Sequence, residues 1–341
     1  MTLYVRLAIV LIGLALAGTS TLASAAAPDV RVSPYTVRCI ADDEIDPKDR
    51  TEVSSAAKSF VEEVFAGDVT TAYGRFSDFG RRDLSPAGFA AASKAIHDLG
   101  PYSGLRVSKT YLTKMKGRGP GTLCGDLSRP EERVEVSLSE APTQAFVIFN
   151  ANGVNNELAI TVWLDSGKDG WRINGLNLTP CTLADRTSAD LLAAARAQRA
   201  AGHAFNARLL YEAAASMAQR GPYLRPAMVS IVRAEANRRD GPPELSGAPP
   251  FNWTLDGQDT RIAQVGPMAI EGELMLVIQE APGSRAFDKD EISRRQQGLI
   301  LDFLKRHPEV VDTFSWINWR SVQPDGVAGF ATVYDLKKGF L

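Results

Sequence analysis

The stretch LAITVWLDSGKDGWRINGLNL, residues 158–178, decides the fold class expected for the first part of the chain. In its second half Trp171 and Ile173 fall on one face of a strand, while Arg172 and Asn174 fall on the other. Lys168-Asp169-Gly170 predicts the turn of a hairpin. Aromatic residues at strand spacing usually pack in a core, so we interpret the hairpin as a core wall. The alternative is that it forms the wall of a ligand pocket.

Helix signals lie upstream of this hairpin, followed by strand signals. Asp46 predicts the cap of a first helix that stops before Gly67, Asp68 caps a short second one, and Ser85-Pro86 starts a third. Beyond them the apolar period changes from helical spacing to two. The expected strands are 105–112, 132–138, 144–150, 156–165 and 170–178. Helices followed by a run of antiparallel strands predict an α+β fold with a sheet curled around the long helix.

Three of these segments carry a resemblance: AAKSFVEEVFAGDVTTAYGRFSD (56–78), SPAGFAAASKAIHDLGP (85–101) and the hairpin itself. Together they resemble the nuclear transport factor 2-like superfamily over about residues 50–178. The resemblance implies a cone-shaped curved sheet wrapped on helices, and dimerisation through the outer face of the sheet is a habit of that family. The candidate lining of the cone consists of Phe60, Tyr73, Phe76, Trp163 and Trp171.

Enzymes of that superfamily use acids, tyrosines or histidines that line the cavity. The candidates in this chain are Tyr73, Asp78, Asp83 and His97. Their spacing does not force any two of them together, and Arg81 and Arg82 flank Asp78 as charge partners. We therefore assign no catalytic residue and interpret these four as structural or solvated.

The chain is expected to continue as separate units after residue 180. Residues 181–239 predict a helical hairpin that resembles a degenerate tetratricopeptide repeat, with Gly202 at its corner and Ala207, Tyr211 and Ala214 in its second helix. Residues 240–250, DGPPELSGAPP, predict a Pro/Gly linker. Residues 251–341 predict a small ββαββ unit, with its first two strands hinged near Gly266-Pro267. The expected domains are thus 46–180, 181–239 and 251–341, after an extended segment 26–45.

The first 25 residues have the layout of a secretory signal peptide: Arg6, an apolar run from Leu7 to Gly18, and Ala23-Ser24-Ala25 as a cleavage pattern. The alternative is an uncleaved anchor helix. We expect an exported, periplasmic or secreted protein with no membrane span after leader cleavage. The 38 Lys and Arg residues nearly balance the 40 Asp and Glu residues, which gives no basis for binding nucleic acid. No cofactor or metal site is predicted, because the three histidines lack ligand spacing.

The chain has three cysteines, and an odd count leaves their connectivity open. If the five expected strands follow one another antiparallel, Cys124 and Cys181 lie at the same end of the sheet. We therefore predict a Cys124–Cys181 disulfide, with Cys39–Cys181 as the second choice.

From these features we expect an exported, non-enzymatic binding or interaction protein of the bacterial envelope. Phe314 and Trp316 fall on one face of a C-terminal strand, and Ile317 and Trp319 fall on the other. This pattern requires a bulge or burial on both sides, and two-sided burial favours packing against another domain or a partner. The other interpretation of these residues is that they lie in the core of the chain itself. The alternative is a binder of a small hydrophobic ligand, or an isomerase-like enzyme, that uses the cone cavity. A homodimer is compatible with both.

Overall fold

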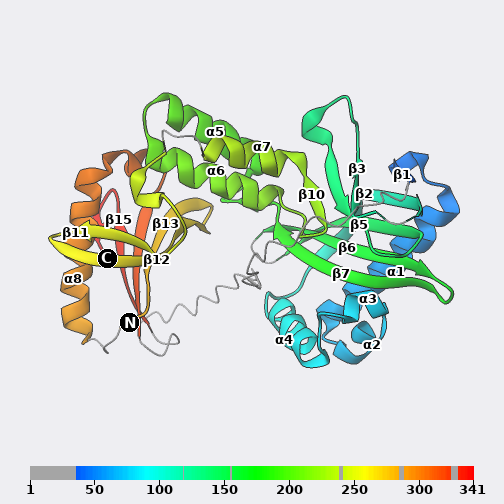
Figure 1. Ribbon diagram of the computed structural model, residues 1–341. Coiled ribbons are helices and arrows are strands. Elements are labelled where there is room, and N and C mark those ends of the chain that lie inside the picture. The colour runs from blue at the N-terminus through cyan, green and yellow to red at the C-terminus, as the bar shows by residue number, and fades with distance from the viewer. Residues whose placement is uncertain (1–35, 118, 154–155, 238–240, 284–287, 324–328) are drawn as a thin grey trace, which may run out of the picture. The chain divides into compact units, whose positions relative to one another are not determined.

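The computed structural model describes residues 36–117, 119–153, 156–237, 241–283, 288–323 and 329–341 (Figure 1). The expected leader, 1–25, and residues 26–35 of the expected extended segment lie outside the described residues. The described chain has the predicted α+β class. It divides into two compact units: one runs to Gly125 and includes Val136–Asn155 and Ile160–Asn177, and the other includes Asp126–Glu135, Asn156–Ala159 and Leu178–Leu341.

The first unit contains four helices among its described residues and a five-stranded sheet in the order β1-β2-β5-β6-β7. The helices are α1 (Pro47–Ala66), α2 (Val69–Gly74), α3 (Asp78–Arg81) and α4 (Pro86–His97), with the 3-10 turn η1 (Asp42–Glu44) before them. The strands of the sheet are β1 (Thr36–Ala41), β2 (Ser103–Lys116), β5 (Thr143–Asn152), β6 (Glu157–Gly167) and β7 (Gly170–Pro180). Two short strands, β3 (Gly121–Cys124) and β4 (Val134–Ser137), pair outside that sheet.

Local side chains begin and end the helices of this unit as the sequence predicts. Asp46 accepts a hydrogen bond from the Lys48 amide at 2.9 Å, and Asp68 caps α2 through the Thr71 amide at 3.1 Å. Gly67 ends α1 with a φ of 75°, in the left-handed region that glycine adopts at little cost. The three predicted helix starts are confirmed.

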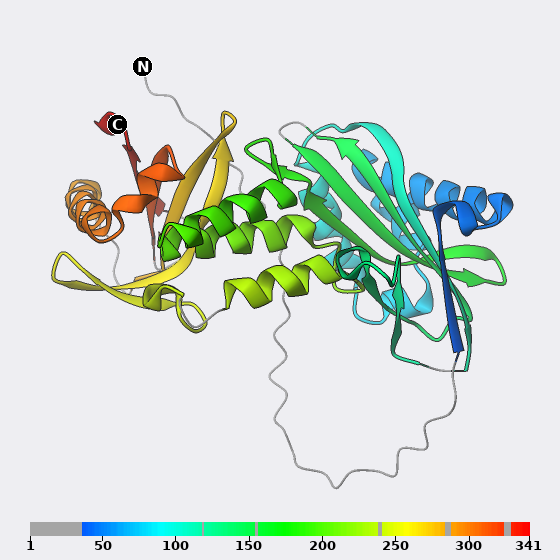
Figure 2. The ribbon, with the colours of Figure 1, turned by 90° about the horizontal axis from the view of Figure 1, so that it is seen from above.

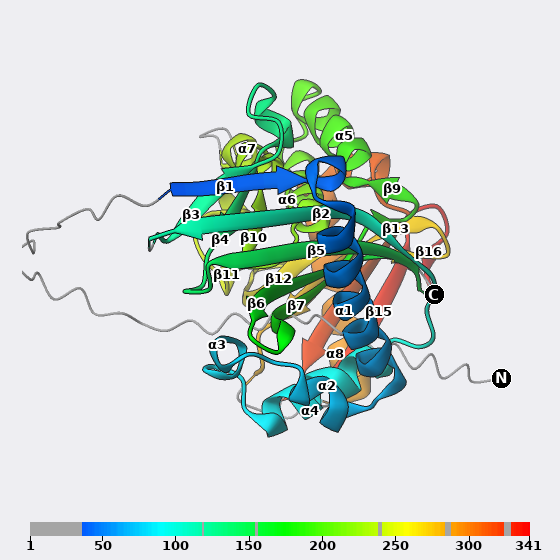
Figure 3. The same cartoon turned by 90° about the vertical axis from the view of Figure 1, so that its right-hand side faces the viewer.

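Helix α1 crosses the strands of the sheet and packs against β2 and β5 (Figure 3). Its stripe of Val53, Ala57, Phe60, Val61 and Val64 is fully buried. The sheet contributes alternate residues that are buried as well: Leu112, Ala145, Val147, Phe149, Ile160, Val162 and Leu164. The buried alternate residues of the strands therefore pack against the buried stripe of α1. The cone-like curvature implied by the family resemblance stays a prediction.

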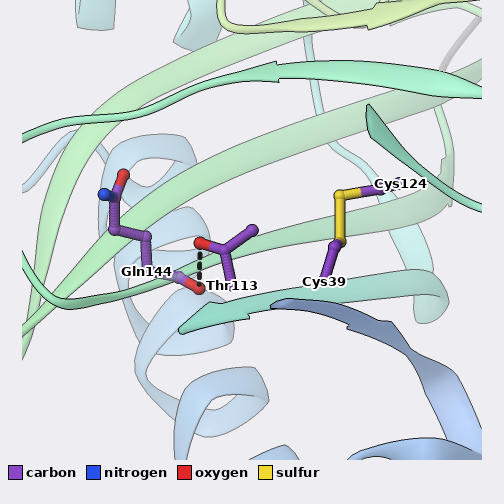
Figure 4. The surroundings of a disulfide bond; sticks show 4 residues. All are labelled: Cys39, Thr113, Cys124 and Gln144. Atoms are coloured by element: carbon purple, nitrogen blue, oxygen red, sulfur yellow. Dashed lines mark hydrogen bonds between the residues drawn. A yellow bond between two sulfur atoms is a disulfide. The ribbon is translucent and has the colours of Figure 1, made fainter. Parts of the chain in front are cut away.

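The predicted Cys124–Cys181 disulfide is wrong, and so is the second choice, Cys39–Cys181. Cys39 is joined to Cys124, with their Cα atoms 5.5 Å apart (Figure 4). The prediction assumed that 105–112 and 132–138 were the first two strands of one sheet. In the structure β1 lies along the edge of β2, with Cys39 opposite Thr113, and β4 belongs to a separate sheet. Cys181 follows β7, which forms the other edge of the five-stranded sheet.

The second unit combines three helices with a six-stranded sheet and its crossover helix. The helices are α5 (Ser188–Ala200), α6 (Ala204–Ala218), α7 (Ala227–Ala236) and α8 (Lys289–Arg306). The sheet consists, in spatial order, of β11 (Phe251–Leu255), β12 (Gln258–Ile270), β13 (Glu273–Glu280), β14 (Trp316–Val322), β15 (Gly329–Asp335) and β16 (Gly339–Phe340). The short elements are η2 (Pro130–Glu132), β8 (Thr182–Leu183), β9 (Arg186–Thr187), β10 (Leu224–Pro226), η3 (Pro243–Leu245) and η4 (Pro308–Asp312).

The three helices α5, α6 and α7 form one layer, in which α6 packs against both of the others (Figure 2). Thr187 and Asp190 form a capping box at the start of α5, and Gly202, with a φ of 84°, turns the chain into α6. The predicted helical hairpin thus corresponds to α5 and α6, and its expected third helix to α7.

The predicted strand–strand–helix–strand–strand order appears as β12, β13, α8, β14 and β15, with one further strand at each end of the sheet. Neighbouring strands are antiparallel except β13 and β14, which are parallel and joined through α8. The expected hinge at Gly266-Pro267 is wrong: both residues lie inside β12, and the chain turns at Glu271-Gly272, where both residues have positive φ. Gly272 supplies this left-handed conformation without the cost of a Cβ atom.

The helical layer and the sheet of the second unit share one hydrophobic core. It runs from Leu191 in α5 through Phe205 in α6 to Phe303 in α8 and Trp319 in β14. The expected linker does not separate two cores, because Leu245 is buried in this cluster and the Glu244 carbonyl accepts a hydrogen bond from the Trp253 indole at 2.8 Å. The domain boundaries at 239 and 251 stay a prediction from composition, but the packing joins the regions on either side of them.

Candidate functional site: a groove on the helical layer

Three of the five candidate cone residues lie together in the first unit. The rings of Phe60 and Phe76 meet edge to face at 5.4 Å, and that of Tyr73 lies 5.9 Å from Phe76. Phe89 closes the group at 5.2 Å from Phe76, and the Tyr73 hydroxyl donates to the Leu84 carbonyl at 3.0 Å. Phe60 and Phe76 are buried. Rings at these distances fill the space between them and form ordinary core packing.

The two tryptophans of the hairpin lie apart from that group. Trp163 stacks on Phe146 at 5.6 Å and meets Phe79 edge to face at 5.2 Å. Its indole nitrogen donates to Gln144 Oε1 at 3.2 Å. Trp171 is half-buried. The hairpin is therefore a core wall at Trp163, and the structure does not bring the five candidate residues together.

Polar side chains of the same hairpin contribute to buried hydrogen bonds. Asp165 in β6 accepts from the Ser139 hydroxyl at 2.8 and 2.9 Å, and Asn174 in β7 accepts from the Ser77 hydroxyl. Burial raises the pKa of Asp165, and the Ser139 hydrogen bonds lower it by less. The sequence placed Asn174 opposite Trp171 correctly but not its burial. These contacts tie β6 and the loop before β5 together, and α3 to β7.

The residues expected to be structural keep local roles. His97 lies 3.0 Å through Nδ1 from the Phe65 carbonyl, which fixes the end of α4 against the end of α1. Arg81 donates to the Gly74 carbonyl at 3.1 Å. In the part of the chain that the structure describes, no group of three or more His, Cys, Asp or Glu side chains could hold a metal ion.

A broad groove lies on the helical layer of the second unit, with a volume of about 680 Å³. Residues from all three helices line it: Arg196, Arg199, Ala200, Tyr211, Ala234 and Glu235. We call these six residues the helical groove. Arg196, Arg199 and Ala200 share one side of α5 because they are three and four residues apart.

Glu235 of α7 connects the two arginines across the groove. Arg196 binds its carboxylate through two hydrogen bonds, Nη2 to Oε1 at 2.6 Å and Nε to Oε2 at 3.0 Å. Arg199 donates to the Glu235 backbone carbonyl at 2.6 Å, and its guanidinium lies 4.6 Å above the ring of Tyr211. The guanidinium planes are thus held by paired hydrogen bonds and by a ring face, arrangements that suit arginine and not lysine.

Three groups of the helical groove, Arg196, Tyr211 and Glu235, keep a fixed charge near neutral pH. Hydrogen bonds from Arg196 lower the pKa of Glu235, and the same carboxylate raises the pKa of Arg196. Burial raises the pKa of Tyr211, whose hydroxyl therefore stays protonated. A general acid or base works best with a pKa near the operating pH. These groups can orient and hold a partner, but they are poorly suited to transferring protons.

Only part of this site can be predicted from the sequence. The helical repeat pattern marks Tyr211, and the i, i+3 spacing of Arg196 and Arg199 indicates a basic side of α5. Glu235 lies 39 residues beyond Arg196 in the sequence, so only the packing of α7 beside α6 brings it to the groove.

A second hollow of the same unit has a volume of about 200 Å³ and is lined in part by Trp253, Phe303 and His307. The His307 ring packs at 4.5 Å from that of Phe205 and lies within 3.6 Å of a Glu244 oxygen. His307 is buried and joins η3 to the end of α8. We interpret this hollow as a packing defect beside the shared core, because its ring side chains already contact one another.

Comparisons of the chain with protein-family models, with curated proteins and with solved structures give no match in any of the three.

Proposed function

We propose that this chain is an exported, non-enzymatic binding or interaction protein of the bacterial envelope, and that it binds a partner protein through the helical groove. The observation that carries the proposal is the groove itself. It is about 680 Å³ in volume and combines fixed charges with an aromatic ring and two exposed alanines. Arginine and tyrosine are enriched where proteins bind one another.

Export is supported by two features. Residues 1–25 have the pattern of a leader, and the Cys39–Cys124 disulfide suits an oxidising compartment. Among the described residues no helix has both the length and the apolar character needed to cross a bilayer. The periplasm is the location we propose.

The resemblance of residues 50–178 to the nuclear transport factor 2-like superfamily remains part of the proposal, as does that of 181–239 to a tetratricopeptide repeat. The packing of α1 on the five-stranded sheet and the Gly202 corner between α5 and α6 support them. The alternative function, a small-molecule binder or isomerase-like enzyme that uses the cone, is less well supported. Phe60 and Phe76, two of the candidate lining residues, pack against each other and against Phe89.

Site-specific photo-crosslinking in the periplasm tests the proposal. A benzophenone amino acid at Ala200 or Ala234, both exposed in the groove, should give adducts of one shared mass with a partner protein. The matched control is Ala197, which is exposed on the same helix and does not line the groove. Ala234→Trp, which fills the groove, should remove the adduct formed from position 200.

Two results would contradict the proposal. Equal adducts at position 197 would mean that contact with the partner does not depend on the groove. The absence of an adduct at both groove positions would exclude the groove as a binding surface under the conditions used. Native mass spectrometry of the mature protein tests the alternative, since a small-molecule mass lost on unfolding would favour the cone cavity.

A further inference from the structure

The two faces of the six-stranded sheet in the second unit are buried to different extents. Helix α8 covers the first of them. On the first face Ile317 and Trp319 are fully buried, and Gln296 of α8 donates to Ser321 at 2.7 Å. Residues one position away point to the other side of the sheet. Trp316 is half-buried there, and Asn318 is 7 % exposed. Strand β14 pairs with both of its neighbours without a bulge. Of the two explanations expected from the sequence, two-sided burial therefore applies.

The register of the strands identifies the neighbours on this other side. Met275 lies opposite both Met268 and Trp316, and Asn318 lies between Val277 and Val333. We define the second face by six side chains: Met268, Met275, Val277, Trp316, Arg320 and Val333. Met275 and Val277 are buried, and the other four are half-buried. A solvated face of a sheet usually alternates to polar residues. Here Met, Val and Trp side chains share the face with the polar Asn318, Gln279 and Asp335 and with Arg320.

Arg320 is the one cation among these six side chains. Its cross-strand neighbours are Gln279 and Ala331, and its neighbours along the strand are Asn318 and Val322, none of which carries a charge. Its Nε donates to Asn318 Oδ1 at 3.1 Å, and among the described residues it makes no ion pair. Burial lowers the pKa of Arg320. The guanidinium is therefore withdrawn from water on an apolar surface without an anion beside it.

One acid on the same side of the sheet, outside the six defining residues, is already engaged by other groups. Asp335 pairs across from Trp316, two rows from Arg320, and accepts hydrogen bonds from the amides of Lys337 and Lys338 at 2.8 and 3.1 Å. The Trp316 side chain also hydrogen-bonds to it. Removing a cation from water without an anion is costly, whereas an acid brought by a partner would offset that cost. A side chain that complements Arg320 must therefore be an acid.

We propose that the second face is a docking surface for an apolar segment of a partner protein that carries one acidic side chain, which pairs with Arg320. The apolar side chains supply contact area, and the guanidinium selects segments in which an Asp or Glu interrupts an apolar run. This surface is distinct from the helical groove, and its occupancy does not depend on the groove being used.

The test combines a stability measurement with crosslinking on the full mature chain. Arg320→Met removes the unpaired cation and should raise the Tm of the isolated protein by about 2–4 °C. Arg261→Met, at an exposed arginine of β12, is the matched control and should leave the Tm unchanged. A benzophenone amino acid at exposed Ala331, beside Arg320, should crosslink a protein segment that contains an acidic residue, and Arg320→Met should remove that adduct.

Several results would overturn the proposal. A lower Tm for Arg320→Met would show that the chain itself holds the guanidinium. An adduct with the mass of a second copy would make the face a homodimer interface, and a fatty-acid mass lost in the variant would make it a lipid site. Absence of an adduct, or an adduct unchanged by Arg320→Met, would also reject it. Crosslinking from position 200 tests the helical groove separately, so either of the two proposals can fail without the other.

Discussion

Two carboxyl groups with the same small exposure show how differently the two units bury charge. Asp165 in the first unit and Glu280 in the second are each 8 % exposed. Asp165 accepts from the Ser139 hydroxyl, and its pKa is raised because burial outweighs those hydrogen bonds. Glu280 instead binds Arg295 at 2.8 Å and also accepts from Trp319 at 2.7 Å. Among the described residues no cation pairs with Asp165, whereas Arg295 pairs with Glu280 in the second unit.

The units also differ in what joins distant segments. In the first unit a disulfide links β1 to β3 across 85 residues of sequence. In the second unit that role falls to the charged network around Glu280, which connects α8 with β13 and β14. A buried pair is sensitive to the loss of either partner, because the remaining charge is left without compensation. We therefore expect that removing the disulfide affects the first unit and that breaking the Glu280 network affects the second.

The largest expected effect is the loss of the disulfide. Replacing Cys39 and Cys124 together by alanine should destabilise the first unit by about 4 kcal/mol, because the open chain regains the entropy of a long loop. Hydrogen exchange should show reduced protection in β1, β2 and β3 and unchanged protection in β12 to β15. Cys181→Ala, which leaves this disulfide intact, is the control. An equal loss of protection in both units would show that the disulfide does not act on the first unit alone.

The next effect concerns the paired acid of the second unit. Glu280→Gln leaves Arg295 without its anion and should cost about 3 kcal/mol of unfolding free energy, as expected when one partner of a buried pair is removed. Glu273→Gln, at the exposed start of β13, should change stability by less than about 0.5 kcal/mol. Urea denaturation measures both. A variant as stable as the Glu273 control would mean that the network contributes nothing.

The smallest effect concerns the acid without a cation, and its signature is a pH dependence. Because the pKa of Asp165 is raised in the folded state, the folded chain binds more protons than the unfolded chain between the ordinary value of 3.8 and the raised value. Wild-type stability should therefore fall as the pH rises through this window. Asp165→Asn should remove that fall, so the variant gains on the wild type from acidic to neutral pH. Unfolding at several pH values measures it, with exposed Asp169→Asn as the control.

Opposite results would invert the comparison. If Asp165→Asn lost stability relative to the wild type as the pH rises, the ionised carboxylate would be the favoured form in the fold. The first unit would then hold its buried acid as an anion.

The features that depend on near neighbours in the chain can be predicted from the sequence. The starts of α1, α2 and α4 follow from Asp46, Asp68 and Ser85, because a cap acts within three residues. The α+β class and the order of strands around α8 follow from the apolar periods. These signals act over a few residues. They predict the observed elements where the tertiary packing favours the same local structure.

The features that depend on distant segments follow only from the tertiary packing. Strand β1 lies against β2, and this pairing brings Cys39 to Cys124, which no spacing in the sequence encodes. Packing of α7 beside α6 places Glu235 against Arg196 and creates the groove. The register of β14 between β13 and β15 leaves Arg320 among uncharged neighbours. Alternation along one strand shows which residues share a face, but only the neighbouring strands and helices decide what that face meets.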